Sequence, residues 1–266
     1  MKASRTQIIR RVVQVTALAA SLAWLVLTIL GGRQIIHQAC PYALVCFGLS
    51  RSNFLRLGNL AMSGAVIFGF TVLVYSMFYG RRFCAYLCPL GSAQEFVYLL
   101  RGRKYRVKHR TPYYVDRKLA WLKYLILLAT VMLTAIGLNY IFIRLCPFYG
   151  LSLLERLVAP GVAVMALILL KAFFGDREWC RFLCPYAALM NIFQWLGEMV
   201  GIRRRKIRRN LERCTDCGVC MLYCPMNINI AESEYVHNRN CIHCGLCADH
   251  CPKPGTYSEE CECEQQ

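Results

Sequence analysis

Charged residues, and acidic ones above all, are scarce in this chain of 266 residues. Asp and Glu number 15 against 32 Lys and Arg, which gives a formal net charge of +17. Charged residues make up 18% of the sequence and hydrophobic residues 57%. This balance argues against an ordinary soluble globular protein and predicts membrane segments.

Four apolar stretches have the length of membrane spans, which need roughly 17–25 residues. They cover about residues 12–30, 59–79, 119–143 and 158–174. The first follows four basic residues, but its apolar run is longer than that of a secretory signal. The sequence therefore predicts an uncleaved first span and a multi-pass α-helical membrane protein.

Two cysteine runs near the end of the chain share one spacing. They are Cys214-x-x-Cys217-x-x-Cys220-x-x-x-Cys224-Pro225 and Cys241-x-x-Cys244-x-x-Cys247-x-x-x-Cys251-Pro252. Bacterial ferredoxins bind two [4Fe–4S] clusters with this spacing, and the fourth cysteine of each run binds the other cluster. The pattern assigns Cys214, Cys217, Cys220 and Cys251 to cluster 1, and Cys241, Cys244, Cys247 and Cys224 to cluster 2.

Zinc binding and disulfide bonding are the alternatives for these eight cysteines. Zinc sites commonly use two C-x-x-C pairs, without two four-cysteine runs that each end in Cys-Pro. Disulfides are rare on the cytoplasmic side of a membrane. A basic run at 203–209 precedes an acidic segment, and this change predicts a small ferredoxin-like domain over residues 203–266.

The distribution of Lys and Arg predicts the orientation in the membrane. The N-terminal flank carries four, the loop between Arg81 and Lys118 carries ten, and the run Arg203–Arg209 follows the last span. The other two loops carry three and two. By the positive-inside rule, both termini and the clusters face the cytoplasm of a bacterial inner membrane. The basic charge indicates contact with anionic lipid and not with nucleic acid.

The membrane part contains an internal repeat. The segment from Arg82 to Pro89 matches the segment from Glu178 to Pro185, and both contain C-x-x-x-C-P. Upstream, Cys40-Pro41 matches Cys146-Pro147. The repeat predicts two two-helix halves, residues 1–118 and 119–202. Each C-x-x-x-C-P proline predicts a bend, followed by a helix that lies along the inner membrane surface.

More than one interpretation is open for each cysteine of this repeat. Cys84, Cys88, Cys180 and Cys184 form a redox or metal contact between the halves, or are small buried residues at a helix junction. Cys40 and Cys146 are expected on the outer side, where a disulfide, a metal site or a partner site is open to them. Cys46 is expected to be a packing residue, and the pattern assigns no role to Cys261 and Cys263.

The four predicted spans, the two C-x-x-x-C-P motifs and the C-terminal ferredoxin-like segment together resemble the NapH family. Its members are the membrane quinol dehydrogenase subunits of periplasmic nitrate reductase systems. The combination is also similar to MauN and to the C-terminal half of NosR. The resemblance rests on Cys84/Cys88-Pro89, Cys180/Cys184-Pro185 and the eight ferredoxin cysteines. It implies electron exchange with a quinone pool and with other redox subunits of a membrane complex.

The leading hypothesis is an iron–sulfur electron-transfer subunit of a respiratory complex, with quinone as a candidate further cofactor. The sequence contains no evident quinone site, and His37 and His109 are only weak candidates for proton carriers. One alternative is a membrane reductase of a metal or thiol in cofactor assembly. A second is a structural anchor whose clusters mainly support the fold.

Overall fold

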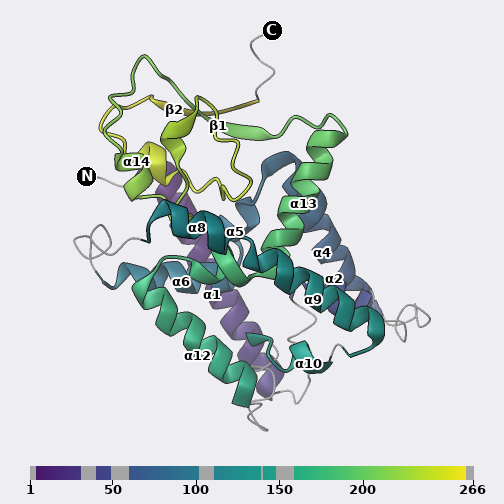
Figure 1. Cartoon of the computed structure of the whole chain (residues 1–266). Helices are drawn as coiled ribbons and strands as arrows, with labels where there is room; N and C mark the ends of the chain where they lie inside the picture. Colours follow the sequence, from purple (N-terminus) through teal and green to yellow (C-terminus); the bar gives the residue numbers. More distant parts are fainter. Residues whose placement is uncertain are drawn as a thin grey trace.

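The computed structural model describes residues 4–30, 40–48, 60–101, 111–138, 140–147 and 159–261, most of them helical (Figure 1). The longer helices are α1 (Arg5–Leu30), α4 (Leu60–Tyr79), α6 (Pro89–Leu99), α9 (Leu122–Ile136), α12 (Ala159–Phe174) and α13 (Pro185–Met199). The shorter ones are α2 (Ala43–Gly48), α5 (Arg82–Tyr86), α8 (Tyr113–Leu119), α10 (Tyr140–Ile143), α14 (Val219–Leu222), α15 (Leu246–Asp249), a π-helical turn η3 (Trp179–Leu183) and a 3-10 turn η4 (Ile230–Glu232). Strands β1 (Arg205–Arg209) and β2 (Tyr257–Cys261) complete the fold. The predicted α-helical class is confirmed.

Helices occupy all four predicted apolar stretches. Two helical segments, Arg5–Leu27 and Tyr113–Ile136, are long and apolar enough to cross a membrane by length and composition. The apolar helical segments Val66–Tyr79 and Pro160–Phe174 are shorter. The arrangement as four spans in two two-helix halves therefore stays a prediction.

The third apolar stretch differs from its predicted bounds of 119–143. Helix α9 ends at Ile136, and α10 begins only at Tyr140. Gly137 follows α9 with a left-handed φ of +88°, a conformation that glycine adopts without steric cost and that commonly ends helices. The apolar run continues past this glycine, so the predicted end was too late.

The outward surfaces of four helices carry exposed apolar side chains. They include Val12, Leu22 and Leu27 in α1, Ile67 and Phe70 in α4, Leu125 and Leu128 in α9, and Leu167 and Leu170 in α12. A large exposed apolar surface marks contact with a membrane or another protein. These side chains provide the surface that lipid would cover.

The helices that follow the C-x-x-x-C-P motifs pack across the two halves of the repeat. Helix α13 packs against α4 (Figure 1), and the Tyr186 hydroxyl donates to the Gly69 carbonyl oxygen at 2.9 Å. Helix α6 packs against α12, and the Arg101 guanidinium lies over the Phe173 ring at 4.3 Å. That these helices lie along the inner membrane surface stays a prediction.

Helix α2 packs against α4 and α9 within the helical bundle. A Cβ atom at Gly69 would lie 2.5 Å from the Pro41 carbonyl oxygen, so only glycine permits this approach. The Tyr42 hydroxyl hydrogen-bonds that of Thr130 in α9. Gly69 and Thr130 lie near the middle of their helices. Cys40, directly before Pro41, is therefore buried within the bundle and does not lie at its predicted outer edge.

The C-terminal segment folds as a small unit on one end of the helical part. Strands β1 and β2 pair antiparallel, from Arg205 opposite Cys261 to Arg209 opposite Tyr257. The start of α1 contacts this unit, since the Gln7 amide donates to the Cys244 carbonyl oxygen at 2.8 Å. The N-terminal end of α1 and the second cysteine run thus lie next to each other, while their orientation to a membrane stays a prediction.

Candidate iron–sulfur site

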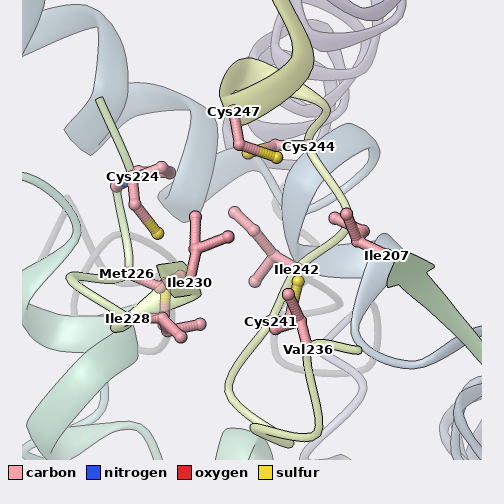
Figure 2. Close-up of a pocket in the computed structure, with 11 residues that line it drawn as sticks. Ile207, Cys224, Met226, Ile228, Ile230, Val236, Cys241, Ile242, Cys244 and Cys247 are labelled. Atoms are coloured by element: carbon pink, nitrogen blue, oxygen red, sulfur yellow. The ribbon is translucent and has the colours of Figure 1, made fainter. Parts of the chain in front are cut away.

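Four of the ferredoxin cysteines surround one small apolar cavity (Figure 2). Three belong to the second run, whereas Cys224 is the last cysteine of the first run. Ile207, Ile228 and Ile242 are among the apolar side chains that complete the lining. The cavity-lining cysteines are Cys224, Cys241, Cys244 and Cys247, the set that the sequence assigns to cluster 2.

The other four ferredoxin cysteines surround a second cavity of different character. They are Cys214, Cys217, Cys220 and Cys251, the set that the sequence assigns to cluster 1. Arg209 and Lys253 also line this cavity, and an Arg209 guanidinium nitrogen lies 3.5 Å from the Cys214 sulfur. Positive charge at this cavity suits the negative charge of a thiolate-bound cluster.

The two cysteine loops have matching backbones. Asp216 and His243, each directly before the second cysteine of its run, have φ values of 48° and 51°. A left-handed conformation is uncommon for residues other than glycine and is held in place by surrounding structure, often at functional sites. The two cysteine loops therefore share a left-handed residue directly before their second cysteine.

The four cysteines at each cavity match the number of thiolates that a cubane cluster binds. Among the residues that the structure describes, no three His, Cys, Asp or Glu side chains are close enough to bind one metal ion. A cubane cluster instead places its four thiolates on four different iron atoms. Burial raises the pKa of the Cys241 thiol to about 12 and that of Cys244 to about 11, so iron binding would release protons from both. That iron binds these eight cysteines stays a prediction.

A buried charge cluster that the sequence analysis missed lies beside the cysteine cavities. Glu95 in α6 is 2% exposed and contacts Arg10 and Arg11 of α1 and Arg177 after α12. Burial alone would raise the pKa of Glu95, but the guanidinium groups of Arg177 and Arg10 hold it well below its usual range. The sequence did carry a signal, because Glu95 is the only acidic residue among the first 115.

A larger cavity, of about 420 Å³, lies between α1, α6 and the ferredoxin segment. Ile8 and Val12 line it from α1, and Cys224 lines it from the cluster 2 set. The Tyr223 and His250 rings stack with centroids 3.7 Å apart at its wall. The cavity therefore joins the apolar surface of α1 to a predicted cluster ligand.

Asp176 adds a titratable group to this cavity. Its Oδ1 atom is buried and has no hydrogen-bond partner among the described residues. Burial and the nearby Glu95 carboxylate raise the pKa of Asp176 to about 7, against the influence of Arg177. The sequence-predicted proton carriers His37 and His109 lie outside the described residues.

Comparison with known proteins identifies two family models along the chain. One described as a 4Fe-4S binding domain matches residues 60–108 and 157–210, and one described as a 4Fe-4S dicluster domain matches residues 206–257. MJ0750 of Methanocaldococcus jannaschii is 30% identical over 72% of this chain and 76% of its own length. The chain belongs to the family of ferredoxin-type membrane proteins.

Other members of this ferredoxin-type family match over shorter shares of their length. The Escherichia coli (strain K12) protein YccM is 30% identical over 59% of this chain and 45% of its own length. The ferredoxin-type protein NapH of the same organism is 28% identical over 63% and 54%. The resemblance to NapH is thus confirmed, while the chain spans only about half the length of these two relatives. No solved structure matches the chain.

The ferredoxin-type chain also contains seven cysteines in its helical part. Cys84, Cys88, Cys180 and Cys184 lie at the junctions that precede α6 and α13. Cys40, Cys46 and Cys146 lie within electrostatic range of one another. The disulfide hypothesis for Cys40 and Cys146 stays open. Cys261 is the last residue of β2, and Cys263 lies outside the described residues.

Proposed function

We propose that this chain is a membrane-bound iron–sulfur subunit that passes electrons between a quinone pool and other redox subunits. The observation that supports this most directly is the pair of cavities, each lined by four cysteines drawn from both runs. In this proposal residues 1–118 and 119–202 form two membrane halves. Residues 203–266 hold two [4Fe–4S] clusters on the cytoplasmic side of a bacterial inner membrane.

The ligands follow from the two cavities. Cys214, Cys217, Cys220 and Cys251 would hold cluster 1, and Cys224, Cys241, Cys244 and Cys247 would hold cluster 2. Each cluster, when bound, supplies one site that gains or loses a single electron. Two such sites match the two electrons that a quinol releases on oxidation to a quinone.

The cavity beside Cys224 is the proposed quinol site. Small-molecule sites are concave, largely apolar and equipped with a few polar groups, and this cavity fits that description. Ile8 and Val12 connect it to the apolar surface of α1, from which a lipid-soluble ring can enter. The Tyr223–His250 stack gives an aromatic face to that ring and lies next to Cys224.

Asp176 is the proposed proton acceptor. Oxidation of one quinol releases two electrons and two protons. Clusters held by the eight cysteines would take up the two electrons, one each, while one proton binds the Asp176 carboxylate and the other passes to water. A general base works best when its pKa lies near the operating pH, and a value of about 7 meets this condition.

Replacing Asp176 with asparagine is expected to slow cluster reduction by quinol by roughly 10²–10⁴-fold, the usual contribution of a positioned base. In the unsubstituted protein the rate should rise with pH through about 7, because Asp176 is ionised only above its pKa. Stopped-flow bleaching of the cluster absorbance by a short-chain quinol measures both effects.

The matched control is Glu178→Gln, because Glu178 lies two residues away and is not among the side chains that line the cavity. Reduction by dithionite should be equal in all three proteins. An unchanged rate and pH profile in Asp176→Asn would remove Asp176 from the proposal. Clusters that dithionite reduces and quinol does not would reject the quinone reaction and favour the reductase or anchor alternatives.

A further inference from the structure

Four cysteines of the internal repeat meet where the two halves pack together. Cys84 and Cys88 flank α5 in the first half, and Cys180 and Cys184 flank η3 in the second. Cys88 and Cys184 have nearly the same backbone conformation, with φ of −69° in both and ψ of 112° and 111°. The repeat thus presents two equivalent cysteine pairs to one interface.

The four sulfurs are close enough to influence one another. Cys180, Cys84 and Cys184 all act electrostatically on Cys88, and Cys84 acts on both Cys180 and Cys184. Backbone amides of Gly91 and Ala187 donate to the Cys88 and Cys184 sulfurs. The Gln94 amide lies 3.7 Å from the Cys180 sulfur. Among the described residues, no group of three such side chains is placed to hold a single metal ion.

A buried positive charge at this interface points to a negative occupant. Arg81 is fully buried, and its guanidinium donates to the Cys180 and Asn240 oxygens, both at 3.2 Å. Within the described residues Arg81 forms no ion pair, and its Nε atom has no hydrogen-bond partner. A buried cation without a counter-charge is costly. An anionic cluster at the adjacent sulfurs would compensate it.

The family match is independent of this geometry. The model described as a 4Fe-4S binding domain matches residues 60–108 and 157–210, which contain none of the eight ferredoxin cysteines. The cysteines within these two segments are Cys84, Cys88, Cys180 and Cys184. Each segment supplies two, and a cubane cluster needs four ligands.

We propose that Cys84, Cys88, Cys180 and Cys184 bind a third [4Fe–4S] cluster, shared between the two halves of the helical part. The proposal rests on the electron-transfer function proposed above and extends its path. Gly91, Ala187 and Gln94 would donate hydrogen bonds to the sulfurs, which tune cluster potentials. The site binds the halves together because neither half alone supplies a complete ligand set.

The third site is also connected to cluster 2. Asn240 directly precedes the cluster 2 ligand Cys241, and its side-chain oxygen accepts hydrogen bonds from Arg81 and from Asn191 of α13. Arg81 in turn contacts the Cys180 carbonyl oxygen. An electron that leaves cluster 2 would reduce the third cluster by one electron, and its onward transfer would reduce a partner subunit by one.

Iron counting on the full-length protein tests this proposal. The protein is purified anaerobically in detergent, reconstituted with iron and sulfide, and measured by elemental analysis and Mössbauer spectroscopy. Three clusters predict about 12 iron atoms per chain, and two predict about 8. The double variant Cys84→Ala/Cys180→Ala should lose about four, with the paramagnetic signals of the tail clusters unchanged.

Cys46→Ala is the matched control, because Cys46 is buried in the same helical part but belongs to no proposed ligand set. About 8 iron atoms in both the unsubstituted protein and the double variant would overturn the third cluster and leave the tail clusters intact. One zinc or copper ion lost on substitution, with iron constant, would overturn it as well. A chain without iron would instead refute the proposed function itself. The count on the unsubstituted protein decides the matter even if the double variant does not fold.

Discussion

Replacing Glu95 with glutamine is expected to destabilise the folded chain by about 3–5 kcal/mol, the usual cost of breaking a buried ion pair by removing one partner. Glu95 receives a hydrogen bond from Arg177 at 2.6 Å, and Arg10 contacts both of its oxygens. Both arginines are fully buried. Glutamine preserves the shape of the side chain but removes the carboxylate charge that the two buried guanidinium groups contact.

The pH dependence follows from the depressed pKa of Glu95. A carboxyl whose folded-state pKa is lowered stabilises the fold above its unfolded value of about 4.3. This stabilisation is lost as the pH falls through the folded-state pKa. The unsubstituted chain should therefore lose stability on acidification through this group, and Glu95→Gln should lack that part of the pH dependence.

Denaturant unfolding in detergent, followed by near-UV circular dichroism at several pH values, measures both effects. Glu234→Gln is the control, because Glu234 and its partner Arg208 are 36% and 27% exposed and lie 2.7 Å apart. An exposed ion pair contributes little to the free energy of unfolding, because water and salt screen it. Equal losses in the two variants would contradict a structural role for the buried cluster.

The contacts of Glu95 could not be predicted from the sequence, whereas the cysteine sets could. The cysteine spacing alone predicted the two four-cysteine sets that line separate cavities, because ligand spacing in ferredoxin loops is a local property. The contact of Glu95 with Arg10 and Arg177 joins positions 85 and 82 residues apart. Periodicity and spacing do not encode such distances, although the isolation of one acid in a basic segment signalled its importance.

The sequence did not predict which helices of the two halves pack against each other. The repeat correctly located the helices after Pro89 and Pro185. The packing of the helix after Pro185 depends on Gly69, whose carbonyl oxygen accepts a hydrogen bond from the Tyr186 hydroxyl and whose missing side chain admits Pro41. A single glycine in an apolar stretch carries no indication of which segment approaches it. The depth of Cys40 was therefore misplaced.

Because the two cysteine runs exchange their fourth ligands, removing Cys224 is expected to affect the cluster of the other run. Cys224 lines the cavity of Cys241, Cys244 and Cys247, although it follows Cys220 in the sequence. Replacing Cys224 with alanine should therefore disrupt cluster 2 and spare cluster 1. Loss of a ligand also weakens the fold around it, because metal binding is coupled to folding.

Double variants separate the crossed arrangement from an uncrossed one. If the ligands cross, Cys224→Ala/Cys244→Ala damages one cluster, with about four iron atoms lost, and Cys224→Ala/Cys217→Ala damages two, with about eight lost. If each run held its own cluster, the two results would be exchanged. Iron analysis and electron paramagnetic resonance of the reduced protein distinguish the cases, and Cys46→Ala reports any loss unrelated to ligation.

Crossed ligands also explain why the two cysteine runs lie on one folded unit. With crossed ligands, Cys251 completes the site of the first run and Cys224 that of the second, so neither run binds a cluster without the other. Binding at either site then stabilises the loops of both. We therefore expect Cys224→Ala to lower the thermal stability of the cluster 1 loop as well, although its iron is retained. Loss of cluster 2 iron with an unchanged melting transition of cluster 1 would show that the two loops fold independently.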